Sequence, residues 1–168
     1  MQIRDARPAE ARIIAELHHA STFAAYAPLY GPEWRPRPLG GRIKLWRRNL
    51  TPGSGVDTLV CVDGAVILGF AALGLNRDGL GDSHGELYTI YVHPEHWRGG
   101  IGSLLLAAAE QSLNNRGFAD AVLWTLELNE RARHFYERHD WHADGAVIAD
   151  DDRAYLRQVR YAKHLATE

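Results

Sequence analysis

The sequence predicts one α+β domain built on a mixed sheet, with a parallel crossover unit near the centre of that sheet. Two observations lead to this fold class. Runs rich in Val, Ile, Thr and Tyr alternate with segments whose apolar residues have helical periodicity, which indicates strands and amphipathic helices. The 168 residues also suit a single domain, because no linker-like stretch or internal repeat divides residues 1–168.

The N-terminal third is expected to begin with an edge strand and a helix. Gln2 to Ala6 has the pattern of a short strand, and Pro8 suits the first turn of the helix that follows. The stretch from His18 to Gly55 is aromatic, basic and rich in proline. We therefore expect irregular structure there, around a short helix near Arg42 to Asn49.

Two β-rich runs in the middle of the chain predict an antiparallel hairpin. Thr58 to Val62 and Ala65 to Leu75 are separated only by Asp63 and Gly64, a pair typical of a type I′ turn. A third run, Glu86 to Val92, follows a loop rich in Gly and Asp and has the composition of a central strand.

Helices and strands alternate through the rest of the chain. Periodicity predicts a helix from about Gly100 to Arg116, which Gly117 can end in the left-handed conformation. In chain order, the remaining expected elements are a strand over 121–126, a helix over 129–139, a weaker strand over 141–148 and a last strand over 155–161. Asp150, Asp151 and Asp152 are expected to form a solvated turn between the last two strands; the alternative is that they attract a cationic acceptor.

Charge and composition exclude several classes of function. The formal charge is −2, with 46% apolar and 24% charged residues, which argues against disorder and against a nucleic-acid binder that neutralises phosphates. No apolar run approaches the length of a signal peptide or a membrane span, so we expect a cytoplasmic protein with no membrane attachment. Cys61 lies in an apolar run and is expected to be a buried structural thiol.

A cluster of glycines stands between the expected central strand and the next helix. Gly99, Gly100 and Gly102 would let a ligand approach the backbone, and a helix N-terminus favours a phosphate group. Taken alone, the cluster fits a tight turn equally well. Leu105 stands where a dinucleotide-binding fingerprint needs its third glycine, and no Gly-Lys-Ser/Thr closes the cluster, so neither a Rossmann site nor a P-loop is expected.

Two longer motifs resemble a known family. Glu86 to Leu105, which reads ELYTIYVHPEHWRGGIGSLL, resembles the central motif of GNAT-family N-acetyltransferases, and Leu126 to Glu137 resembles a second motif of that family. The resemblance implies a GNAT-like, mostly antiparallel central sheet of about seven strands flanked by about four helices. It also implies that acetyl-CoA donates an acetyl group to an amine by direct attack in a ternary complex.

The resemblance assigns cofactor-binding residues. The strand backbone over 90–92 would bond the pantetheine arm as an added strand does, with an amide near Ile90 or Tyr91 holding the oxyanion. The turn over 97–103 would present amides to the pyrophosphate. Asn129 would fix the pantetheine arm, and it is also a good N-cap for its helix. The implied residues are Ile90, Tyr91, Val92, Trp97, Arg98, Gly99, Gly100, Ile101, Gly102, Ser103 and Asn129.

Tyr136 and Glu86 are the candidate catalytic residues. Tyr136 matches the family's general acid, and a phenol with a pKa of about 10 can protonate a thiolate whose conjugate acid has a pKa of about 8.5. Its alternative role is core packing beside Ala132 and Phe135. Glu86 would act as a base on the amine through a water molecule. The alternative is that Glu86 is only a solvated charge at the strand end. In that case Glu127, or water alone, could serve as the base.

Three positions depart from the family pattern. Trp97 stands where many relatives have Arg or Gln, and Arg98 replaces a frequent glycine, so Arg98 is a candidate for the missing charge. Asp140 also occupies a common glycine position, although Asp tolerates a left-handed backbone better than most residues.

His93 and His96 suggest a metal site, but no HExxH or Cys/His spacing accompanies them, so no metal is expected.

The acceptor and the assembly state stay open. The acceptor is expected to be a small-molecule or peptide amine, and residues 18–55, which should shape its pocket, are where the resemblance is thinnest. The aromatic residues of that segment could line a pocket or anchor a loop. A homodimer is a family-level expectation. The alternative function is a non-catalytic acyl-CoA-binding or sensing domain, against which Asn129 and Tyr136 argue.

Overall fold

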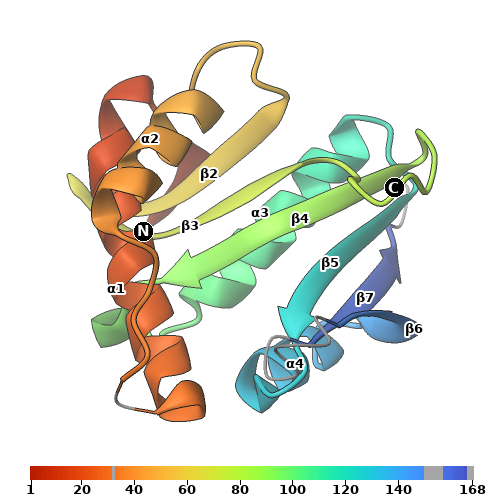
Figure 1. Cartoon of the computed structure of the whole chain (residues 1–168). Coiled ribbons are helices and arrows are strands. Elements are labelled where there is room, and N and C mark those ends of the chain that lie inside the picture. The colour runs from red at the N-terminus through yellow and green to blue at the C-terminus, as the bar shows by residue number, and fades with distance from the viewer. Residues whose placement is uncertain (32, 150–156, 166–168) are drawn as a thin grey trace.

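The computed structural model describes residues 1–31, 33–149 and 157–165. In these residues the chain forms one seven-stranded sheet with the order β1-β2-β3-β4-β5-β7-β6 (Figure 1). Neighbouring strands are antiparallel except β4 and β5, which are parallel. The strands are β1 (Gln2–Asp5), β2 (Val56–Asp63), β3 (Val66–Leu75), β4 (His84–Val92), β5 (Asp120–Leu126), β6 (His142–Ile148) and β7 (Gln158–His164). The predicted α+β class with its mixed sheet is confirmed.

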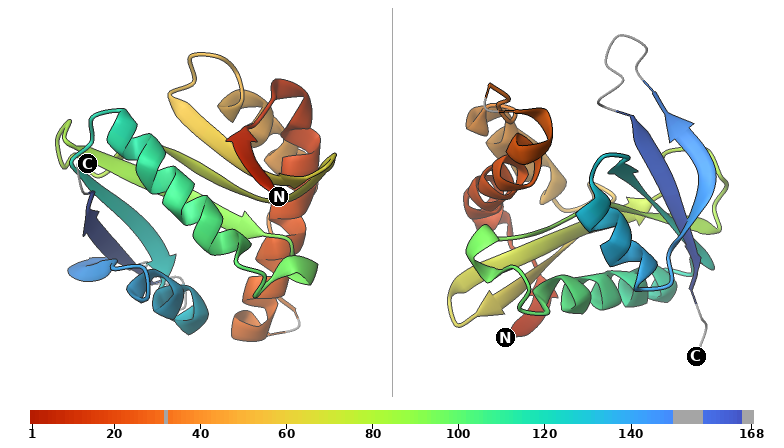
Figure 2. Two further views of the ribbon diagram at one scale, coloured as in Figure 1. Left: turned by 180° about the vertical axis from the view of Figure 1, so that it is seen from behind. Right: turned by 90° about the horizontal axis from the view of Figure 1, so that it is seen from below.

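Four α-helices occur in the described residues, and three of them cover the half of the sheet made by β1 to β4. α1 and α2 pack on one face of that half, and α3 crosses the other face (Figure 2). α4 lies beyond the end of β5. The helices are α1 (Ala11–Tyr30), α2 (Leu39–Asn49), α3 (Ile101–Asn115) and α4 (Glu130–Glu137), with single 3₁₀ turns η1 (Pro8–Glu10) and η2 (Pro94–His96).

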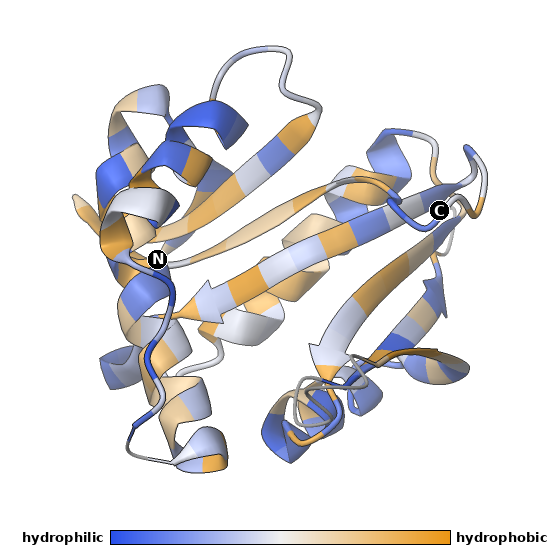
Figure 3. Ribbon diagram, in the orientation of Figure 1, coloured by the Kyte–Doolittle hydropathy of each residue, from blue (hydrophilic) through white to orange (hydrophobic). Residues whose placement is uncertain are grey.

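The alternation of side chains along the strands divides the apolar interior into two cores. One core lies between the sheet and α3, around Leu105 and Trp141, and the other lies beneath α1 and α2, around Trp46 and Phe70. Figure 3 shows that β2 and β3 carry long apolar stretches, as expected of strands that are covered on both faces. Cys61 is buried in the α3-side core, which confirms the expected structural thiol.

The first helix is longer than the sequence predicts. We expect irregular structure from His18 onward, but α1 continues to Tyr30, with Pro28 in its last turn. A proline in this place removes one backbone hydrogen bond of the helix. Tertiary contact outweighs that loss, because Ser21 is buried in α1 and its hydroxyl donates a hydrogen bond to the carbonyl of Val92 (3.0 Å).

The second helix and the hairpin turn also differ from expectation. α2 begins at Leu39 rather than near Arg42. The β2–β3 hairpin is confirmed, but its two loop residues are Gly64 and Ala65. Only Gly64 of this pair has a positive φ, at 56°, which is the pattern of a type II′ turn instead of type I′.

The elements of the C-terminal half follow the prediction closely. Gly117 (φ 87°) and Asp140 (φ 62°) both adopt the left-handed backbone that the sequence predicts after α3 and α4. The described part of β7 begins at Gln158. Tyr155, where the last strand is expected to begin, and the acidic triplet Asp150 to Asp152 lie outside the described residues.

Candidate active site

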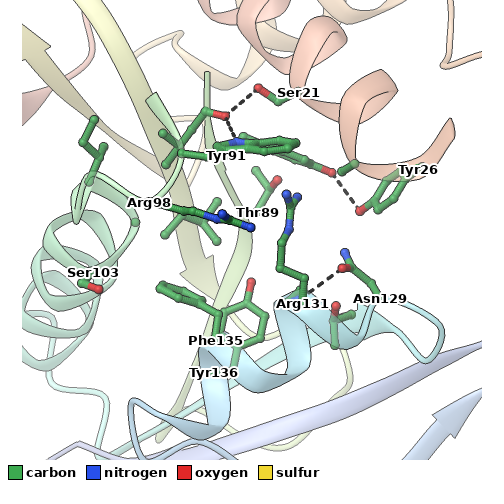
Figure 4. Close-up of a pocket in the computed structure, with 18 of the residues that line it drawn as sticks. Ser21, Tyr26, Thr89, Tyr91, Arg98, Ser103, Asn129, Arg131, Phe135 and Tyr136 are labelled. Carbon is green, nitrogen blue, oxygen red and sulfur yellow. Dashed lines mark hydrogen bonds between the residues drawn. The ribbon is translucent and has the colours of Figure 1, made fainter. Parts of the chain in front are cut away.

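A cleft opens where β4 and β5 part. The parallel ladder pairs only 84–87 with 120–123, and the two strands diverge beyond these residues. Tyr88 forms a bulge, because Leu87 and Thr89 pair with successive residues of β3 and leave Tyr88 without a partner. The cleft has a volume of about 700 Å³, and its walls come from α1, β4, β5, the connection from β4 to α3, α3 and α4 (Figure 4).

The backbone of β4 presents polar groups to this cleft at alternate residues. Tyr91 is paired with β3, and the amide of His93 donates a hydrogen bond to the carbonyl of Leu68 in β3 (2.8 Å). The alternation of an antiparallel ladder therefore directs the amide and carbonyl of Tyr91 toward β3, and those of Ile90 and Val92 toward the cleft. Of the two predicted oxyanion donors, only the Ile90 amide has the right direction.

The carbonyl of Val92 is already bonded within the chain. It accepts hydrogen bonds from Ser21 Oγ (3.0 Å) and from the indole nitrogen of Trp97 (2.8 Å). A ligand that adds to β4 as a strand would therefore use the Val92 amide and the two backbone groups of Ile90. The same two bonds tie α1 and the start of the Gly-rich turn to β4.

The N-terminus of α3 offers amides that have no helical partner. The amide of Leu104 bonds the carbonyl of Gly100 (3.1 Å), so the amides of Ile101, Gly102 and Ser103 precede the first helical bond and belong to residues that line the cleft. These groups and the helix dipole together favour an anion such as a pyrophosphate. The start of α3 thus presents free amides to the cleft, and their role in binding a pyrophosphate stays a prediction.

The turn before α3 has two residues with left-handed backbone, which are separated by Gly99. Gly100 has φ 79°, and Arg98 has φ 66°, a conformation that costs an ordinary residue about 1 kcal/mol relative to glycine. This explains why glycine is frequent at the position of Arg98. All the predicted cofactor-binding residues line the cleft except Gly99, whose neighbour on the inner side is the carbonyl of His96.

Arg131 is a cleft residue that the sequence analysis missed. Its guanidinium carbon lies 3.8 Å from the centre of the Trp97 ring, a cation–π contact that joins α4 to the Gly-rich turn. Burial and the nearby charge of Arg98 lower the pKa of Arg131, while Tyr26 opposes this shift. Trp97 thus holds an arginine from another element near the place where many relatives have their own Arg or Gln. Only the position of Arg131 within the second motif could have suggested it.

Tyr136 is both a core residue and a cleft residue. Its ring packs against Phe135 (5.4 Å between centroids), Tyr161 (6.2 Å) and Trp141 (6.4 Å), and only 8% of the residue is exposed. Its hydroxyl is directed into the cleft (Figure 4). Burial, with a smaller contribution from Tyr91, raises the pKa of Tyr136 above its ordinary value. The phenol is therefore protonated at neutral pH, the state that a proton donor requires.

Asn129 has its expected capping role and also lies at the cleft. It is the N-cap of α4, where its Oδ1 accepts a hydrogen bond from the amide of Ala132 (3.2 Å). It also lines the cleft beside Arg131, as Figure 4 shows. The side-chain amide nitrogen is left free of the capping bond and can donate to a ligand.

Glu86 does not line the cleft, contrary to the expectation that it assists the amine. It is 1% exposed and forms an ion pair with Arg77, whose Nε lies 3.2 and 3.1 Å from the two carboxylate oxygens. The amide of Arg77 donates to the same carboxylate (2.9 Å). Glu127 likewise pairs with Arg157 (3.1 Å). No Asp or Glu is among the described residues that line the cleft, whereas Arg98, Arg131 and Arg138 are.

Comparison with known proteins agrees with this geometry. The model of the family described as "Acetyltransferase (GNAT) family" matches residues 14–141, which is most of the chain. The protein belongs to the GNAT acetyltransferase family. Like other members, this GNAT enzyme is an N-acetyltransferase that uses acetyl-CoA, and the free β4 groups, the α3 amides and Asn129 fit that cofactor.

Individual relatives cover nearly the whole GNAT domain. A "Probable N-acetyltransferase" of Mycobacterium tuberculosis is 28% identical over 152 residues, covering 88% of this chain and 83% of the relative. The L-amino acid N-acyltransferase MnaT of Escherichia coli is 26% identical over 138 residues, covering 82% and 77% of the two chains. The structure of yncA from Salmonella typhimurium with acetyl-CoA has a TM-score of 0.74 and 20% identity, covering 100% of this chain and 95% of that one.

Two further findings concern metal and membrane. Within the described ranges, no three His, Cys, Asp or Glu side chains converge as a metal site would require, and His93 and His96 stand as a ring pair (5.8 Å) without a third ligand. Among the same residues, no helix has the length and apolar character to span a bilayer.

Proposed function

We propose that this enzyme transfers the acetyl group of acetyl-CoA to the primary amine of a small molecule or peptide by direct attack in a ternary complex. The observation that carries the proposal is the position of the Tyr136 hydroxyl in a cleft that also holds the free backbone groups of β4 and α3. No residue in this arrangement has to act as a covalent nucleophile. Cys61 is buried in the core beside α3 and has no access to the cleft.

Different groups of the chain would bind different parts of acetyl-CoA. The amides of Ile101, Gly102 and Ser103 and the charges of Arg98 and Arg131 would hold the pyrophosphate. Ile90, the Val92 amide and Asn129 would bind the amide groups of the pantetheine arm. The arm then lies along β4, and its thioester end lies near Tyr136.

The reaction follows from this placement. Acetyl-CoA supplies a thioester, whose carbonyl oxygen would accept a hydrogen bond from the Ile90 amide as negative charge develops on it. The amine nitrogen forms a bond to the acetyl carbon, the carbon–sulfur bond breaks, and Tyr136 gives its proton to the departing thiolate. Water removes the surplus proton from the nitrogen, because none of the described residues that line the cleft is a carboxylate, and a proton from solvent restores the Tyr136 phenol.

Release of coenzyme A thiol with a panel of amines tests the proposal. Thiol release that requires both an amine and acetyl-CoA, with one acetyl-amine formed per thiol, is the expected result. The competing function, a non-catalytic acyl-CoA sensor, predicts binding of acetyl-CoA by calorimetry without amine-dependent thiol release. The presence of a protonated Tyr136 in the cleft favours the catalytic function.

A further inference from the structure

Arg42 is a buried cation that has no ion-pair partner among the described residues. It lies in the second turn of α2, is 7% exposed, and precedes the buried Trp46 by one helical turn. Its Nε is buried without a hydrogen-bond partner. The ion pairs and cation–π contacts of the described residues also leave Arg42 out. Burial of an arginine is costly unless an anion or hydrogen-bond acceptors compensate it.

Among the described residues, the groups that act electrostatically on Arg42 include no anion. Tyr91 and Tyr26 lie within electrostatic range of the guanidinium, as does the like charge of Arg37. His18, also within range, is neutral: burial, the charge of Arg42 and that of His19 lower its pKa to about 3. The environment of Arg42 is therefore made of neutral phenol and imidazole groups and a second positive charge.

Two of these neighbours connect Arg42 to the active-site cleft. Tyr91 and Tyr26 line the cleft, and their hydroxyl oxygens are 3.1 Å apart (Figure 4). The ring of His18 lies 4.7 Å from that of Tyr91, and its Nδ1 accepts a hydrogen bond from the Trp46 indole (3.1 Å). Arg42 thus stands beside the wall formed by α1 and the end of β4, on the face of the sheet opposite α3.

The other cations of the cleft have a different partner. Arg98 and Arg131 lie by the N-terminus of α3, where the cofactor phosphates bind under the proposed function. Arg42 belongs to α2, across the sheet from α3, so the same phosphates do not account for it. Among the described residues that line the cleft, none is a carboxylate that would attract a polycationic amine. The charge of this site complements an acceptor that carries a negative group of its own.

We propose that the acceptor is an amine that also carries a carboxylate, as a free amino acid does, and that Arg42 binds that carboxylate. This inference rests on the proposed function. The pair formed is an arginine–carboxylate pair in a largely dehydrated setting, where its geometry is specific. Tyr26 and Tyr91 form the polar edge beside it, and the amine of the bound acceptor extends toward Ile90 and Tyr136.

Matched acceptors test this proposal directly. L-Leucine and 4-aminobutyrate are each compared with the corresponding carboxamide, and spermidine serves as a polycationic acceptor. The amide of leucine is the weaker base and is more often neutral, so a preference for the acid cannot arise from the reactivity of its amine. The expected result is a kcat/KM at least tenfold higher for one or both acids than for their amides, with spermidine below both acids.

The variants Arg42→Gln and Arg42→Lys locate the effect. Arg42→Gln is expected to raise the KM for the preferred acid at least tenfold and to leave the KM for the amide within threefold of the wild type. Arg42→Lys should restore part of the preference for the acid. The matched control is Arg48→Gln, which replaces an exposed arginine on the same helix and should change neither KM. Thermal unfolding and the Kd for coenzyme A are measured for every variant.

A binding readout separates this inference from the proposed function. Calorimetry of the acid and its amide against the enzyme saturated with coenzyme A requires no turnover. Selective binding of the acid that Arg42→Gln abolishes supports the anion site even if no thiol is released, an outcome that would contradict only the proposed function. Three outcomes would each overturn the inference. The enzyme could bind acid and amide equally, or it could prefer spermidine. The main effect of Arg42→Gln could also be weaker binding of coenzyme A.

Discussion

The two walls of the cleft are built in different ways. The cofactor wall, formed by β4 and the start of α3, presents mainly backbone groups, whereas the acceptor wall, formed by α1 and the end of β4, presents the side chains of Tyr26 and Tyr91, with Arg42 of α2 behind them. A backbone wall tolerates changes of side chain, as the presence of Trp97 illustrates. A wall of side chains changes its ligand when those residues change. Under the proposed function, the family reaction depends on the first wall and the choice of acceptor depends on the second.

Replacement of Tyr136 is expected to have the largest effect, because Tyr136 stands between the two walls. Tyr136→Phe keeps the ring in its core position and removes only the acid, so kcat should fall about 100-fold or more while the Kd for coenzyme A changes less than threefold. Steady-state kinetics and calorimetry measure the two quantities. A kcat within threefold of the wild type would show that the thiolate takes its proton from elsewhere.

The acceptor wall should be sensitive to acid. The folded pKa of His18 is about 3, below its ordinary value of 6.5, so its stabilising contribution is complete above pH 6.5 and is lost as the pH falls toward 3. When the pH falls from 7 to 5, protonation linked to this group alone should lower the free energy of unfolding by about 2 kcal/mol. Urea unfolding of His18→Gln should show a flatter pH dependence, and the exposed His134→Gln should match the wild type.

The Glu86–Arg77 pair lies outside both walls and should affect stability more than catalysis. Glu86→Gln removes one partner of a pair in which the carboxylate is buried and the arginine side chain is 63% exposed, so a loss of about 2 kcal/mol is expected. Arg77→Gln should cost a similar amount. The kcat of folded Glu86→Gln should stay within fivefold of the wild type. A loss of about 100-fold with unchanged stability would instead restore Glu86 as a base.

Arg131 tests whether the cofactor wall needs side-chain charge. Arg131→Met keeps the contact with Trp97 apolar and removes a cation near the α3 amides, so the Kd for coenzyme A should rise about tenfold, with a weaker dependence on salt. The free backbone amides should preserve the remaining affinity. Dephospho-coenzyme A is the control ligand: an equal loss with it assigns Arg131 to the pyrophosphate, and no loss would assign it to the 3′-phosphate.

Arg98→Gly should have the smallest effect and the opposite sign on stability. Glycine relieves the left-handed strain at φ 66°, which should raise the unfolding free energy by about 1 kcal/mol. Loss of the Arg98 charge should weaken coenzyme A binding less than tenfold. Denaturant unfolding and calorimetry separate the two effects, and a destabilised variant would mean that the arginine side chain contributes more than its backbone costs.

Several features followed from short segments of sequence. The alternating runs predicted the sheet and its crossover, and the Gly-rich turn, Asn129 and Tyr136 all reach the cleft. These features depend on local patterns: a strand followed by a glycine turn and a helix places free amides in one spot whatever the rest of the chain does. The extent of α1 was not predictable in this way, because contact with β4 outweighs the local effect of Pro28.

Other features were decided by the tertiary structure alone. Glu86 looked available in sequence, but the loop after β3 brings Arg77 onto both of its oxygens. Arg131 gained its place through contact with Trp97, and Arg42 became a buried, unpaired charge only when α2 packed against α1 and the sheet. A pattern within a segment determines how its backbone folds. The partner and the hydration of a charged side chain depend on elements distant in sequence, so the sequence alone could not pair Glu86 with Arg77 or bury Arg42.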